Sequence, residues 1–146
     1  EIGNARNVIN TELRKKNPRY DRGDKQLHVD TSGVLGELIA MDYLTNNNIE
    51  FEMAEMLSPY PSKNADFVLK KTRIDVKATI HFPNAHLLVN HEAHHKGLNI
   101  IDKYWFIYIL DKENAEFYSV NYNDLSKWNC KKMGYTNAYY IKRENL

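Results

Sequence analysis

Residues 64–79 read NADFVLKKTRIDVKAT, in which two short runs of alternating apolar and polar residues flank the pair Lys70-Lys71. This pattern is typical of a β-hairpin. Side chains two residues apart on a strand point to the same face, so Asp75 and Lys77 are expected to lie together. A turn at Lys70-Lys71 sets Asp66 directly opposite Asp75 on that face. The other face is predicted to be buried, with Phe67, Leu69, Ile74, Val76 and Ala78.

The composition is that of a soluble globular protein, with 146 residues of which 42% are hydrophobic and 27% charged. This length predicts a single domain. The longest apolar run, Tyr104 to Leu110, has the length of a strand, so no membrane span is expected. Cys130 is the single cysteine. A disulfide framework and a cysteine zinc site are therefore excluded, and a reducing, cytoplasmic location is expected.

The charge balance is nearly neutral, with a formal net charge of +1, and does not by itself indicate a polyanionic partner. Basic residues are nevertheless concentrated near both ends of the chain. They form either a basic face for nucleic acid or a set of solvated surface side chains, and the sequence leaves both readings open. The residues concerned are Arg14, Lys15, Lys16, Arg19, Arg22, Lys25, Lys127, Lys131, Lys132, Lys142 and Arg143.

The expected architecture is an α/β domain whose mixed β-sheet is flanked by helices. A helix is predicted to begin near Gly33, capped by Asp30-Thr31-Ser32, to run through Leu44 and to end at Asn46-Asn47-Asn48. A shorter helix is predicted over residues 2–16. Further strands are predicted at 49–54, 85–89, 104–110, 115–120 and, at an edge, 139–141, with an irregular histidine-rich segment at 90–99 and a helical turn at 125–128. Residues 1–30 are expected to form an N-terminal arm or helix, 31–128 the core and 129–146 a C-terminal extension.

Glu37 lies on the stripe of the predicted helix that also carries Gly33, Ala40, Met41 and Leu44. An acid at this position is not on a solvated face, and burying it without a partner is costly. Glu37 therefore either serves a site or pairs with a neighbouring segment or lysine.

The acids of the hairpin suit a divalent metal ion, because Mg²⁺ prefers oxygen ligands. Asp66 and Asp75 would bind it from adjacent strands and Glu37 from the helix, with the backbone carbonyl of Val76 as a further ligand. Lys77 is placed to orient or deprotonate an attacking water and to balance developing charge. The alternative is an exposed Asp-Lys pair on an ordinary hairpin.

Three motifs in order, Gly-x-x-Gly-Glu (33–37), Asn-Ala-Asp (64–66) and Ile-Asp-Val-Lys (74–77), resemble the PD-(D/E)xK nuclease superfamily, whose fold is restriction-endonuclease-like. The resemblance spans residues 33–125, and Ala65 departs from the proline of the pattern. It implies that Glu37, Asp66 and Asp75 bind Mg²⁺, for which Mn²⁺ substitutes, and that Lys77 assists water activation. The implied activity is hydrolysis of DNA phosphodiester bonds by a restriction-type or structure-specific endonuclease. A homodimer would place two such sites across a duplex. A catalytically inactive nucleic-acid-binding module of the same fold is the alternative.

Residues 91–95 read HEAHH and match the H-E-x-x-H signature of zinc proteases. That mechanism needs a continuing helix and a third ligand, whereas Lys96-Gly97 follows at once and no third ligand has a recognised spacing. A second interpretation is that these basic side chains reach DNA bases or phosphates, and a third is a polar surface loop. The residues assigned to nucleic-acid binding are His91, His94, His95, Lys96, Lys70, Lys71 and Arg73.

Overall fold

The computed structural model describes residues 26–54, 65–80, 86–111, 113–133 and 136–146. The predicted helix over 2–16 and Asn64 of the Asn-Ala-Asp motif lie outside these ranges. In chain order the elements are α2 (Gln26–Asn46), β1 (Glu52–Met53), β2 (Phe67–Leu69), β3 (Thr72–Thr79), β4 (His86–Asn90), α3 (His91–Lys96), β5 (Lys103–Ile109), β6 (Ala115–Asn121), α4 (Tyr122–Leu125), β7 (Asn129–Met133), β8 (Thr136–Lys142) and the 3₁₀ turn η3 (Arg143–Asn145).

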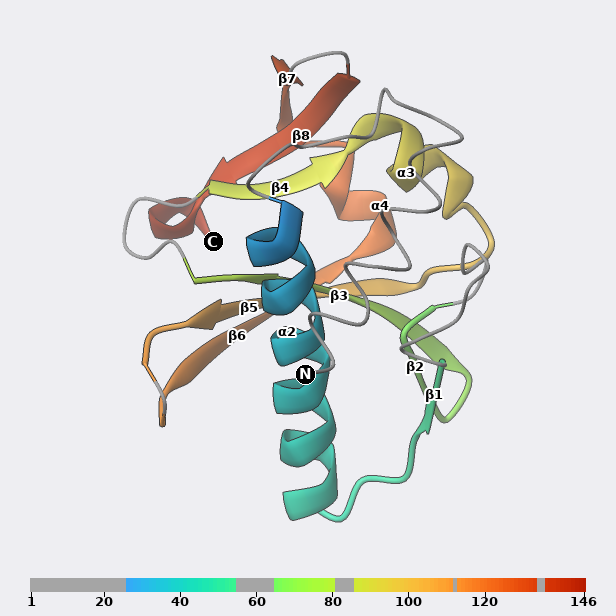
Figure 1. Cartoon of the computed structure of the whole chain (residues 1–146). Coiled ribbons are helices and arrows are strands. Elements are labelled where there is room, and N and C mark those ends of the chain that lie inside the picture. Colours follow the sequence, from blue (N-terminus) through green and yellow to red (C-terminus); the bar gives the residue numbers. More distant parts are fainter. Residues whose placement is uncertain (1–25, 55–64, 81–85, 112, 134–135) are drawn as a thin grey trace.

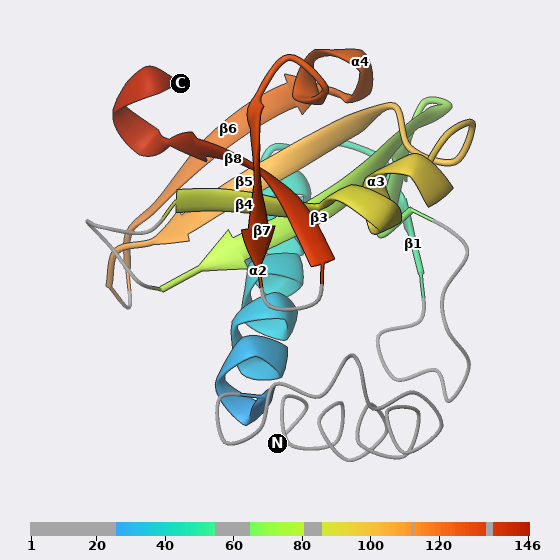
Figure 2. The same ribbon diagram turned by 90° about the horizontal axis from the view of Figure 1, so that it is seen from above.

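The strands form two sheets, one of five strands in the order β1-β2-β3-β5-β6 and one of three in the order β4-β8-β7. Strands β3 and β5 run parallel, and all other neighbours run antiparallel. Figures 1 and 2 show α2 against one face of the larger sheet and the smaller sheet on the opposite side. The prediction of an α/β fold with a mixed sheet is therefore confirmed.

The predicted hairpin is present, and its turn lies at Lys70-Lys71. Phe67 pairs with Ile74, and Leu69 pairs with Thr72. The two turn residues have positive φ angles of 45° and 73°. Two-residue hairpin turns favour this left-handed conformation because its twist matches that of the strands. The turn fixes the register, and the register decides which side chains share a face.

Two hydrophobic cores lie on opposite faces of the larger sheet. Strand β5 is buried on both sides, since Tyr104, Phe106 and Tyr108 join one core while Ile107 and Ile109 join the other. This explains why its sequence is a continuous apolar run without alternation. The core under α2 contains Ala40, Leu44, Phe67, Ile74 and Val76 as well, and the core between the sheets adds Leu87, Val89, Tyr122, Leu125 and Tyr139.

Helix α2 begins at Gln26 within the described residues, so the predicted start at Gly33 is wrong. The expected capping residues Asp30-Thr31-Ser32 lie inside the helix. Packing overrides the weak preference of such residues for helix ends, and Ser32 is buried. The predicted end of the helix, at Asn46, is confirmed.

The C-terminal segment differs most from its prediction. Residues 139–141 belong to β8, which is not an edge strand but the central strand of the smaller sheet. Strand β7 was missed, the helical turn lies at 122–125 rather than 125–128, and the histidine-rich segment contains the short helix α3. Pairing between β8 and β4 joins residues about 50 positions apart, and local sequence patterns carry little information about such contacts.

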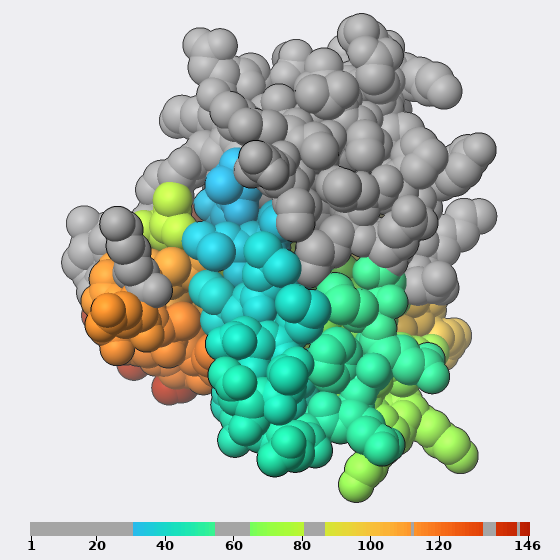
Figure 3. Space-filling view, turned by 60° about the horizontal axis from the view of Figure 1, so that its bottom comes forward, coloured from blue at the N-terminus to red at the C-terminus, as the bar shows by residue number. Residues whose placement is uncertain are grey.

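The outer face of α2 is visible between the segment around β1 and the end of the β5–β6 hairpin (Figure 3). The ring of Tyr43 packs against Phe117 of β6, with 5.1 Å between the ring centroids.

Within the ranges described, no helix has the length and apolar character needed to cross a membrane.

The contact between α2 and β3 leaves no room for a side chain at Gly36. A Cβ atom added there would collide with the Cβ of Ala78. Alanine normally stabilises a helix interior relative to glycine by about 1 kcal/mol. We expect Gly36→Ala to do the opposite and to lower the free energy of unfolding by about 1–3 kcal/mol, the usual effect of overpacking.

Urea unfolding followed by circular dichroism measures this change, with the exposed helical substitution Thr31→Ala as the control. A Gly36→Ala variant as stable as the control would mean that α2 does not lie this close to β3.

Candidate functional site

Asp66 and Asp75 lie across from each other on the face of the sheet that is turned away from α2. The register that pairs Phe67 with Ile74 places Asp66 opposite Asp75 when it is extended by one residue. Oδ2 of Asp66 accepts a hydrogen bond from the backbone N–H of Val76, with 2.7 Å between the heavy atoms. The backbone carbonyl of Asp66 accepts another from Ala54 at 2.9 Å. Both the side chain and the main chain of Asp66 are therefore fixed.

Among the described residues, strand β2 does not extend along the edge of β3 beside these acids. Strand β2 begins at Phe67, so residues 75–79 of β3 have no partner from β2, although they remain paired with β5 on their other side. At one of these residues, Val76, the backbone N–H donates its hydrogen bond to the Asp66 carboxylate instead of to a neighbouring strand. A group from α2, which packs on the opposite face of the sheet, also acts on these acids.

Glu37 is that group. It is buried, as predicted, with 7% of its surface exposed. Its charge acts on both Asp66 and Lys77 and raises the pKa of each. Gly36 brings α2 close to Val76 and Ala78 of β3, which explains why a glutamate at the next position reaches the cluster.

Lys77 forms an ion pair with Oδ2 of Asp75. That oxygen is buried and has no hydrogen bond of regular geometry within the described chain. Burial lowers the pKa of Lys77, but the charges of Asp75, Asp66 and Glu37 outweigh it, and the net pKa is raised. Lys77 is therefore an ammonium at neutral pH.

The folded state raises the pKa of Asp66 from 3.8 to about 7, which is unusually high for an aspartate. Burial is the largest cause, followed by repulsion from Asp75 and then from Glu37; Lys77 and the Val76 amide lower the pKa by less. The shift therefore reflects mainly the burial of Asp66, with the two neighbouring acids adding to it. Perturbed pKa values of this kind are concentrated at functional sites, although structural ion pairs also produce them.

Glu37, Asp66, Asp75 and Lys77 are thus close enough for their charges to interact. Even so, among the described residues no group of three His, Cys, Asp or Glu side chains is arranged to hold a metal ion. Asp66 is turned to the Val76 amide and Asp75 to Lys77. Metal binding by these acids, and by the Val76 carbonyl, stays a prediction.

The basic residues of the hairpin are placed differently from one another. Lys70 and Lys71 are exposed at the turn. Arg73 instead makes hydrogen bonds with both carboxylate oxygens of Asp102, each at 2.9 Å, and with the carbonyl of Asn99. This pairing lowers the pKa of Asp102 to about 2. Arg73 therefore holds the segment before β5 in place.

The predicted nucleic-acid-binding residues of the histidine segment lie on α3. His91, His95 and Lys96 are at least partly exposed, and Lys96 forms an ion pair with Glu92 at 2.8 Å. His94 is buried, with its Nδ1 atom 2.8 Å from the hydroxyl of Tyr104. Burial, and then the neighbouring His95 and His91, lower the pKa of His94 to about 4. His94 is a neutral core residue at physiological pH.

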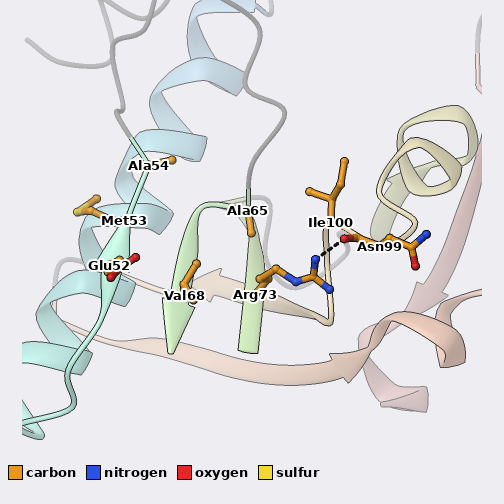
Figure 4. A pocket seen from close by; sticks show the side chains of 8 residues that line it. All are labelled: Glu52, Met53, Ala54, Ala65, Val68, Arg73, Asn99 and Ile100. Carbon is orange, nitrogen blue, oxygen red and sulfur yellow. Dashed lines mark hydrogen bonds between the residues drawn. The ribbon is translucent and has the colours of Figure 1, made fainter. Parts of the chain in front are cut away.

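A pocket of about 440 Å³ opens beside the acids, and sequence reasoning missed it. Glu52, Val68 and Arg73 form one row across β1, β2 and β3, on the same face as Asp66 and Asp75. Figure 4 shows these residues with Asn99 and Ile100 on the far side of the pocket. The alternation of β2 and β3 indicated the shared face, but the strand pairing of Glu52 required the structure.

Tyr104 is another neighbour that the sequence did not reveal. It pairs with Asp75 across β3 and β5. Burial, followed by the Asp75 charge, raises the pKa of the Tyr104 hydroxyl well above its ordinary value. Tyr104 therefore stays protonated between the acid cluster and His94.

No protein-family model matches this sequence, and no curated protein matches it.

Proposed function

We propose that this protein is a magnesium-dependent endonuclease acting on DNA, with a restriction-endonuclease-like arrangement of its α/β fold. One observation carries the proposal: Glu37 of α2 is buried and its charge acts on Asp66 and Lys77, Asp66 accepts a hydrogen bond from the Val76 amide of β3, and Lys77 of β3 forms an ion pair with Asp75. Asp66, Asp75 and Lys77 share one hairpin, whereas Glu37 comes from a separate helix, so the approach of Glu37 to the hairpin is not a consequence of local spacing.

The carboxylate oxygens of this cluster are the donor type that a divalent cation such as Mg²⁺ prefers. Three acids around one lysine leave an excess of negative charge, and Oδ2 of Asp75 is buried without a regular hydrogen bond. Asp66, Asp75 and Glu37 would hold Mg²⁺ or Mn²⁺, with the Val76 carbonyl as a further ligand. When bound, the ion would lower the pKa of a water and stabilise charge in the transition state.

Lys77 would act as a cation rather than as a base, because its raised pKa keeps the ammonium protonated. In the present arrangement it neutralises Asp75. With substrate bound, Nζ would turn to the phosphate, orient the attacking water and balance the charge that develops on the phosphate oxygens. Its side chain is 40% exposed, which leaves it access to a ligand.

DNA would enter along the face that carries the acids and the pocket lined by Arg73 and Asn99. Lys70 and Lys71 are exposed nearby on the hairpin turn and suit phosphate contacts. From α3, the exposed Lys96 would contact the duplex. A homodimer would present two acid clusters to the two strands, and an intracellular location fits the free, exposed Cys130.

Incubation of supercoiled plasmid with the purified protein tests the proposal. We expect conversion to open-circular or linear DNA with Mg²⁺ or Mn²⁺ and none in EDTA. The inactive binding module is the second candidate, favoured by the lack of a ready-made group of metal ligands within the described residues. It predicts retarded DNA in a gel without cleavage of supercoiled, linear or single-stranded substrates, a result that would overturn the nuclease.

A further inference from the structure

The side chains of His91 and His95 meet on the exposed side of α3. The two residues are four apart in the sequence and therefore lie on one face of the helix. Their Nε2 atoms are 3.1 Å apart, and their ring centroids are 4.3 Å apart. The two rings thus meet through their Nε2 atoms, which lie within hydrogen-bond distance of each other.

This separation suits a shared metal ion. Each imidazole nitrogen bound to zinc lies about 2.0–2.1 Å from it, so two on one ion are about 2.8–3.4 Å apart for angles of about 90–110°. The observed 3.1 Å falls within that range. Small side-chain rotations would replace the contact between the two nitrogens by two metal–nitrogen bonds.

Contacts on both sides hold this pair in place. The ring of Tyr139 on β8 stacks on His91 at 5.1 Å between centroids, and its hydroxyl lies 3.3 Å from Nε2 of His95. Between the two ligands, the backbone carbonyl of the buried His94 accepts a hydrogen bond from Tyr122 at 2.5 Å. Figure 2 shows α3 beside β8, at the end of β4. The helix is therefore anchored before any ligand arrives, which favours binding.

We propose that His91 and His95 bind one zinc-class transition-metal ion, Zn²⁺, Ni²⁺ or Cu²⁺, through both Nε2 atoms. Imidazole ligands select these ions over Mg²⁺, which the acid cluster would take. Water completes the coordination, with the Tyr139 hydroxyl close enough to hydrogen-bond to it. The site does not require the protease mechanism, because Glu92 is paired with Lys96 and α3 ends at Lys96.

Titration of metal-free full-length protein with Zn²⁺, in competition with a coloured chelator, measures this site. We expect one ion per chain, and binding weakened about tenfold or more by His91→Gln or His95→Gln. The matched control combines His95→Asn with Lys96→His, which keeps the number of histidines but moves the second one off the shared face. It is expected to bind as weakly as the single variants.

A second readout is the electron paramagnetic resonance spectrum of bound Cu²⁺, which reports its nitrogen ligands without any nuclease assay. Hyperfine splitting from two nitrogens in the wild type, lost in both single variants, would support the site. Equal Zn²⁺ affinity in the wild type and all three variants, or displacement of Zn²⁺ by millimolar Mg²⁺, would overturn it. Neither result bears on whether the acid cluster cleaves DNA.

Discussion

Replacement of Lys77 by methionine is expected to slow DNA cleavage by about 10²–10⁴-fold, the usual contribution of one positioned catalytic group. Methionine keeps the length of the side chain but removes the charge that pairs with Asp75 and faces Asp66 and Glu37. The rate of plasmid linearisation at saturating Mg²⁺ measures the effect. Arginine at the same position separates the contribution of the positive charge from that of the lysine geometry, since it supplies a permanent charge with a different geometry.

The control for this experiment is Lys103→Met. Lys103 lies opposite Ile74 on the neighbouring strand, so its side chain is on the other face of the sheet from Asp75. We expect that variant to cleave DNA as the wild type does. A Lys77→Met protein that retains its circular dichroism spectrum and cleaves at the wild-type rate would remove Lys77 from the mechanism.

The sequence was informative about the candidate site because the site depends on short-range periodicity. Strand alternation placed Asp75 and Lys77 on one face, and the turn at Lys70-Lys71 fixed the register that brings Asp66 opposite Asp75. Helical spacing was enough to predict that Glu37 does not lie on the solvated surface, and Glu37 is indeed buried. Each of these inferences lies within a single hairpin or helix, where local geometry decides the outcome.

Contacts between distant segments could not be predicted in the same way. The pairing of β8 with β4 and the contact of His94 with Tyr104 depend on how two sheets pack. His94 illustrates the difficulty, because its sequence neighbours suggest a polar surface segment while the fold buries it between aromatic rings. The prediction of the start of α2 failed for a related reason, because residues that usually cap a helix are held inside this one by packing.

The Asp66→Asn variant is expected to be inactive yet more stable than the wild type at alkaline pH. The folded state raises the pKa of Asp66 from 3.8 to about 7, so it binds a proton that the unfolded chain releases at lower pH. Wild-type stability therefore falls as the pH rises from about 4 to about 7, and the full penalty remains above pH 7. Asparagine has no charge to bury and retains an oxygen that can accept the Val76 N–H.

Urea unfolding of the metal-free proteins at pH 4 and pH 8 measures this difference. We expect similar stabilities at pH 4 and an advantage of roughly 2–4 kcal/mol for Asp66→Asn at pH 8. The titration of His94 occurs in both proteins and cancels in the comparison. Asp111→Asn is the control with the opposite sign, because hydrogen bonds from Asn114 and the Glu113 backbone lower the pKa of Asp111, and its loss should destabilise the protein at pH 8.

The effect of added Mg²⁺ on stability distinguishes an acid cluster that binds a cation from one that is only destabilised by its surroundings. A cation at the cluster would relieve the repulsion among Asp66, Asp75 and Glu37, so wild-type stability at pH 8 should rise with Mg²⁺ concentration, whereas Asp66→Asn should respond far less. At pH 5, where Asp66 holds a proton, the wild type should also respond weakly. If Asp66→Asn has no advantage at pH 8, the carboxylate is not destabilised by its neighbours. If that advantage is present but Mg²⁺ does not reduce it, the three acids repel one another without forming a cation site, and the cluster has lost the physical basis for catalysis.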